Sequence, residues 1–244
     1  MIESPRLKPI RVRDLIVALV ACDLLLLAGH LLFSGHPFLG NFFDLDLEGN
    51  LPTWYSSFKF ILAAAAALMG YHAETEAQGE GVRRGAWVWL LIAALMLGMS
   101  LDETGQLHEA LTNWLMSSHT GENLRVAQGV SKDAGTLLWG VVFGPFLALL
   151  ALAMFFFYFS RFKAQPWLMA GYVLAVALLA TKLVLETKEA KLLSVPGMLS
   201  ADRWSRYRVS IAVELMAQVL GTSAFVIVHY AYALSNLRGR GRRG

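Results

Sequence analysis

Apolar residues along the chain gather into six long runs separated by shorter polar segments. We expect each run to form a helix long enough to cross a hydrocarbon core of about 30 Å, at a rise of 1.5 Å per residue. The strict apolar and polar alternation of a membrane barrel is absent, so helices are the expected spanning elements. The predicted spans are about 14–34, 54–72, 86–105, 135–159, 166–186 and 209–234.

Composition favours a membrane protein over a soluble one. Of the 244 residues, 56% are hydrophobic and only 16% are charged, whereas a soluble domain of this length needs more polar surface. Basic residues followed by an apolar run are typical of a signal peptide, but the following LLFSGHPF offers no small-residue cleavage site, so we expect a retained anchor. The predicted fold is an all-α bundle of six transmembrane helices in a single domain, 1–244.

Lysine and arginine predict the orientation. With the N-terminus inside, 12 of the 21 basic residues lie in inside segments and 7 in outside segments, while Lys59 and Lys182 are placed at helix ends. This bias predicts a multi-pass protein of a bacterial inner membrane with both termini cytoplasmic. We expect the basic tail at 236–244 to contact anionic lipid rather than nucleic acid. The expected partners are membrane lipid and, as an alternative, other membrane subunits.

The segment SLDETGQLHE at 100–109 follows directly on the run AWVWLLIAALMLGM, which has 14 residues and is too short to span a membrane. Asp102 and Glu103 are therefore expected in the outer part of the membrane. Carboxylates are unfavourable there unless they face the bundle interior, a partner or water. If the helix continues, Asp102, Gln106 and Glu109 share one face and His108 lies on another.

These residue types fit two kinds of chemistry. Carboxylates and imidazole can ligate iron, manganese or zinc, or they can act as general acid and base. The expected metal ligands are Asp102, His108, Glu109 and Glu214, and the expected catalytic residues are Asp102, Glu103, Glu109 and Glu214. The Glu-x-x-His spacing of bundle di-metal sites is missing from this segment, and the single Cys22 rules out a thiolate site. The alternative is a helix end that leaves the membrane and is solvated.

Other polar residues fall mostly on the same predicted side of the membrane. Glu214 and Gln218 form a stripe on the last span, and Lys182 and Glu186 have the spacing of a helical ion pair. Asp23 and His30 share a face of the first span. The first outer loop, FDLDLEGN, carries Asp44, Asp46 and Glu48. That loop begins like a calcium loop, but Tyr55 stands where a bidentate Glu is required, so an acidic turn is favoured.

Two of these segments resemble motifs of a known group of proteins. FDLDLEGNLPTWYSS at 43–57 and SLDETGQLHE at 100–109 resemble a widespread group of small, uncharacterised bacterial inner-membrane proteins. In that group an acidic loop runs into a Pro-Thr-Trp helix start, and the second motif ends the third helix. The resemblance implies that these polar positions belong to one site, but it implies no activity. At Gln218 the chain has an amide where the resemblance implies an acid.

The sequence alone leaves three possible functions. The first is a membrane-embedded enzyme, dependent on a metal or on acid and base residues, that acts on a lipid-like substrate at the outer leaflet. The second is an accessory or assembly subunit of a larger membrane complex, with the polar groups as interhelical hydrogen bonds. The third is a proton-coupled transporter that uses Asp23 and Glu214. The sequence shows no inverted repeat, which argues against the third.

Overall fold

The computed structural model describes residues 10–33, 35–45, 47, 49–76, 85–107, 110–111, 114, 135–193 and 201–238. Within these ranges the chain is helical and contains no strand, which confirms the all-α class. A helix overlaps each of the six predicted runs. The helices are α1 (Val12–Phe33), α2 (Leu39–Phe43), α3 (Leu51–Glu76), α4 (Val88–Gly105), α7 (Gly135–Phe162), α8 (Pro166–Leu193) and α9 (Ala201–Arg238).

Three of the described helical segments are long and apolar enough to cross a membrane. They are α1, α4 and the part of α9 from Ala212 to Leu237. Two shorter apolar segments lie in α7 and α8, over Ala148–Phe162 and Pro166–Lys182. The structure is therefore that of a helical protein with several membrane-compatible helices.

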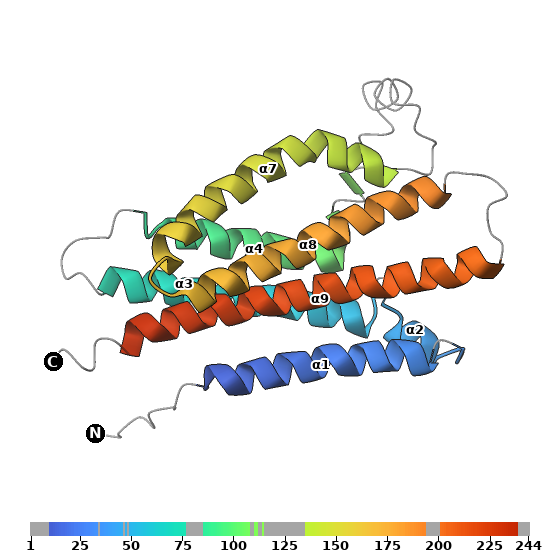
Figure 1. Ribbon diagram of the computed structural model, residues 1–244, viewed down its shortest axis with the longest axis horizontal. Coiled ribbons are helices and arrows are strands. Elements are labelled where there is room, and N and C mark those ends of the chain that lie inside the picture. The colour runs from blue at the N-terminus through green and yellow to red at the C-terminus, as the bar shows by residue number, and fades with distance from the viewer. Residues whose placement is uncertain are drawn as a thin grey trace.

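The long helices run roughly along one axis, so that the start of α1 and the end of α9 lie at the same end of the bundle (Figure 1). Helix α9 is central, because α1, α3 and α8 all pack against it, while α4 packs on α3 and α7 packs on α8. Helix α7 is visibly curved in Figure 1 and contains Pro145, which removes one backbone hydrogen bond and bends a helix.

Small residues on α3 bring its neighbours close. Four of the five alanines at 63–67 are buried, and a Cβ added to Gly70 would lie 3.2 Å from the Trp89 ring of α4. Small side chains at helix interfaces let backbones approach and increase van der Waals contact. The core that forms around this stripe is aromatic toward the end of the bundle where α9 finishes, and polar further along toward the start of α3.

Candidate functional site

The interior of the bundle contains a buried ion pair between α1 and α3. The Lys59 Nζ lies 3.3 Å from the Asp23 Oδ1, and both side chains have an exposed fraction of 0%. Asp23 belongs to the narrow buried stripe of α1, together with Leu19 and Leu26. Lys59 belongs to the buried face of α3. Their helical positions therefore point both charges into the bundle.

Helix α9 completes the hydrogen bonding of this pair. The Ser223 hydroxyl donates to the Asp23 Oδ2 at 2.7 Å, and the Lys59 ammonium donates to the Val219 carbonyl at 2.6 Å and to the Ser223 Oγ at 3.4 Å. The ammonium also lies 4.6 Å from the centre of the Tyr55 ring, an attractive cation–π contact. A buried charge is tolerated when it is paired and hydrogen-bonded in this way.

The sequence placed Lys59 at a helix end, and that placement is wrong. Helix α3 begins at Leu51 rather than near residue 54, because Asn50 caps it by accepting a hydrogen bond from the Thr53 amide at 3.3 Å. Lys59 is eight residues beyond Leu51, or about 12 Å inside the helix. A lysine this far inside an apolar helix is the sequence feature that predicts a buried partner for its charge.

The polar residues of α4 and α9 do meet. The Gln218 Nε2 of α9 donates to the Glu103 carboxylate of α4, at 3.2 and 3.3 Å from its two oxygens. Glu214, one helical turn earlier, is 7% exposed and so faces the bundle rather than lipid. The predicted stripe of the last span therefore lines an interior face, and Gln218 makes the link to Glu103.

The stripe expected along an uninterrupted helix after Asp102 is not formed. Helix α4 ends at Gly105, and Gln106 adopts a left-handed conformation with φ of 51°. Its amide donates to the Asp102 carbonyl at 2.8 Å, which closes the helix. Because the left-handed residue turns the chain, Gln106 does not continue the face on which Asp102 lies.

Part of the predicted outer site lies outside the described residues. Asp46, Glu48, His108 and Glu109 are in this group, and so is the side chain of Glu186, so the proposed pairing with Lys182 stays a prediction. In the described part of the chain no cluster of three His, Cys, Asp or Glu side chains is positioned to hold a metal ion. The metal site therefore stays a prediction that depends on His108 and Glu109.

His30 faces the acidic loop rather than Asp23. Its Nδ1 accepts a hydrogen bond from the Leu45 amide at 3.2 Å and lies 3.4 Å from the Asp44 Oδ1. The shared face of Asp23 and His30 therefore does not make them a pair. The contact instead ties the end of α1 to the segment that leads into α3.

A second buried acid joins four helices toward the other end of the bundle. Glu74 of α3 accepts hydrogen bonds from the Trp89 indole of α4 at 3.0 Å, the Tyr232 hydroxyl of α9 at 2.6 Å and the Arg161 Nε of α7 at 3.2 Å. Glu74 lies beyond the predicted span 54–72. Burial disfavours its charged form, but the three donors outweigh that effect, and the pKa of Glu74 lies below its ordinary value.

His229 of α9 is fully buried and contacts the same Trp89 ring that donates to Glu74. Its Nε2 is 2.5 Å from the Tyr158 hydroxyl, and the two rings are stacked. Trp89 meets the His229 ring edge-on and stacks with Tyr232. Glu74, Tyr158 and Tyr232 did not stand out in the sequence, because an acid near a helix end is usually solvated and aromatic residues of apolar helices usually face lipid.

Comparison with known proteins gives a family. The family model described as a domain of unknown function, DUF8692, matches residues 16–232. No curated protein and no solved structure matches the chain. Because the matched segment covers most of the sequence, from α1 to the last third of α9, the chain belongs to the DUF8692 family.

Proposed function

We propose that the chain is a six-span bacterial inner-membrane protein of the transporter class that takes up and releases protons at the Asp23–Lys59 pair and so passes them across the membrane. The observation that carries the proposal is the complete burial of both charges, at an exposed fraction of 0%. Ionisable groups inside a membrane bundle are usually functional. A proton can reach such a pair along hydrogen bonds, whereas a larger substrate needs an open cavity beside it.

The proposed orientation has both termini in the cytoplasm. The excess of Lys and Arg in the predicted inside segments supports it, and the start of α1 lies at the same end of the bundle as the end of α9 (Figure 1). With this orientation, Glu103 and Gln218 lie toward the outer side, Glu74 lies toward the cytoplasmic side, and the Asp23–Lys59 pair lies between them.

Polar contacts lead from the outer side toward the pair. Glu103 is partly exposed and is bonded to Gln218. The Ser57 and Ser100 hydroxyls, 2.7 Å apart, form a further polar contact between α3 and α4. Ser57 lies two residues before Lys59 on α3, so these groups support an approach of protons toward the pair from the outer side.

Protonation of Asp23 would change how α1 is held. The carboxylate takes up one proton and loses its charge, so its attraction to the Lys59 ammonium is lost, while Lys59 keeps the Val219 carbonyl as an acceptor. The buried stripe of α1 is narrow, comprising Leu19, Asp23, Leu26 and Gly29. A change at one residue of this stripe therefore alters a large share of the contact between α1 and the bundle, and so links protonation to movement of a helix.

The test is proton flux into vesicles that contain the purified protein. A pH gradient is imposed across vesicles holding a pH-sensitive dye, with valinomycin and potassium to compensate charge. We expect acidification with the wild-type protein and with Asp14→Asn, an exposed acid of the same helix. We expect Asp23→Asn to fall to the rate of protein-free vesicles. Equal rates for Asp23→Asn and the wild type would refute the proposal.

A purely structural ion pair would behave differently in a second variant. Replacing a buried ion pair by apolar residues of similar volume is often neutral or stabilising, so the double variant Asp23→Leu, Lys59→Met should keep the helical bundle. We expect this folded variant to have lost proton flux. Full flux in it would show that the pair only holds the helices together.

The outer-leaflet enzyme is a second candidate, and the Glu103–Gln218 bond favours it because it brings α4 carboxylates next to the stripe that contains Glu214. Its test is the content of iron, manganese or zinc in protein purified in mild detergent. About one equivalent in the wild type, lost in a folded His108→Ala, Glu214→Ala double variant, would support a metal-dependent enzyme. Absence of metal in both proteins would refute this version.

A further inference from the structure

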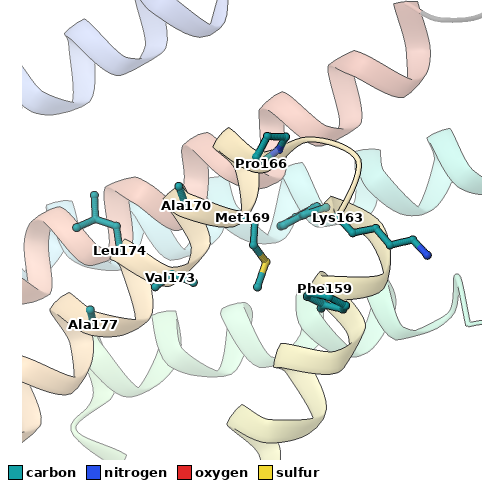
Figure 2. A pocket seen from close by; sticks show the side chains of 9 residues that line it. Phe159, Lys163, Pro166, Met169, Ala170, Val173, Leu174 and Ala177 are labelled. Atoms are coloured by element: carbon teal, nitrogen blue, oxygen red, sulfur yellow. The ribbon is translucent and has the colours of Figure 1, made fainter.

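The turn between α7 and α8 borders an open apolar groove. Its lining comes from the last turns of α7 and from one face of α8 (Figure 2). In Figure 2 the Met169 side chain points from α8 toward Phe159 of α7, and the Lys163 amino group points away from both. Ala170 and Ala177 lie on the α8 side, and their short side chains leave the space that forms the groove.

The length of the groove matches one leaflet of a membrane. From Pro166 to Ala177 the α8 side advances eleven residues, which is about 16 Å at 1.5 Å per residue. Half of a hydrocarbon core of about 30 Å is about 15 Å. An acyl chain lying along the groove from the membrane surface would therefore end near the middle of the bilayer.

The positive charge at the mouth of the groove favours an anionic lipid. Lys163 is exposed and is the only charged residue among the nine that line the groove. Arg161, two residues earlier, is bonded to the buried Glu74 carboxylate. A lysine at the membrane surface places its ammonium at the level of the lipid phosphates.

We propose that this groove binds one acyl chain of an anionic phospholipid of the inner leaflet, with the lipid phosphate against the Lys163 ammonium. The site depends on the proposed orientation, in which the α7–α8 turn is cytoplasmic, but not on proton transfer at Asp23. A bound lipid would fill the space between α7 and α8, which contact each other less extensively than α8 contacts α9.

Native mass spectrometry of the full-length protein in mild detergent tests the site. The protein is titrated with phosphatidylglycerol or with phosphatidylcholine carrying the same acyl chains. We expect tighter binding of phosphatidylglycerol, and we expect Lys163→Gln to weaken it about fivefold, the effect of one basic residue near an anionic surface. Arg13→Gln, at an exposed position of α1, is the matched control and should leave the preference unchanged.

A second variant tests the apolar part of the groove. Ala170→Phe should fill it and reduce binding of both lipids, whereas Ala21→Phe, at an exposed position of α1, should not. Equal affinity of the wild type for the two lipids, or an unchanged preference in Lys163→Gln, would overturn the inference. Either result would leave the proton-flux measurement untouched, so the two proposals fail separately.

Discussion

At the residue scale, buried polar side chains join the helices of the bundle through hydrogen bonds. Glu74 illustrates this, since one carboxylate receives donors from Trp89, Tyr232 and Arg161 on three other helices. Glu76, two residues later, is about half exposed, and its carboxylate lies 2.7 Å from the Nε2 of the exposed His72. The two acids therefore differ in environment while sharing a helix end, and this makes them a matched pair for mutation.

We predict that Glu74→Gln lowers stability by about 1–3 kcal/mol, because the charge-assisted bonds are lost and the amide presents a donor to Arg161. This corresponds to a melting temperature roughly 2–12 °C lower in mild detergent. Glu76→Gln should change the free energy of unfolding by no more than about 0.5 kcal/mol, which shifts the melting temperature by about 2 °C or less. A Glu74→Gln melting temperature equal to that of Glu76→Gln would contradict the assigned role.

The same comparison has a pH dependence with a defined sign. The pKa of Glu74 is lower in the folded protein than its ordinary value, so its contribution to stability is complete above the ordinary pKa. That contribution is lost as the pH falls through the lower, folded-state pKa. The difference in melting temperature between the wild type and Glu74→Gln should therefore be largest near neutral pH and shrink in acid.

At the element scale, close approach of helices decides the packing of α8 on α9. A Cβ added to Gly221 of α9 would lie 3.1 Å from the Leu179 side chain and 3.2 Å from the Ala175 carbonyl of α8. We predict that Gly221→Leu forces the two helices apart and lowers stability by about 1–3 kcal/mol. Thermal unfolding in detergent measures this change.

Gly98→Leu is the control for that substitution. Gly98 is exposed on α4, and a Cβ there would meet no described atom within 4 Å. The same change in size and helix propensity should therefore be neutral or slightly stabilising. An equal loss of stability in both variants would show that leucine is disfavoured in these helices generally rather than at the α8–α9 contact.

At the scale of the whole molecule, the orientation in the membrane can be measured directly. With Cys22→Ser as background, Leu47→Cys lies in the loop before α3, and Ala164→Cys lies in the turn between α7 and α8. We predict that an impermeant maleimide labels Leu47→Cys in intact cells with a permeabilised outer membrane, and labels Ala164→Cys only after the inner membrane is opened. The reverse pattern would invert the proposed orientation and remove the inner-leaflet lipid site.

The helices were largely predictable, whereas the residues of the candidate site were only partly so. Asp23, Glu103, Glu214 and Gln218 stood out because polar groups in apolar runs are unusual, and three helices of the described chain are long and apolar enough to cross a membrane. The depth of Lys59 was predicted wrongly because α3 begins at Leu51, three residues before the predicted start near residue 54. Helix ends are predicted less accurately than the helices themselves.

Sequence alone determined that this chain is helical and apolar, because long apolar runs and the need to satisfy backbone hydrogen bonds leave few other arrangements. Only the tertiary structure decided which polar residues meet. Asp23 and Ser223 are 200 positions apart, and Glu74 gathers donors from helices that begin at Val88, Gly135 and Ala201. Such pairings depend on helix adjacency and rotation, which follow from side-chain packing between helices and leave no periodic signal within any one of them.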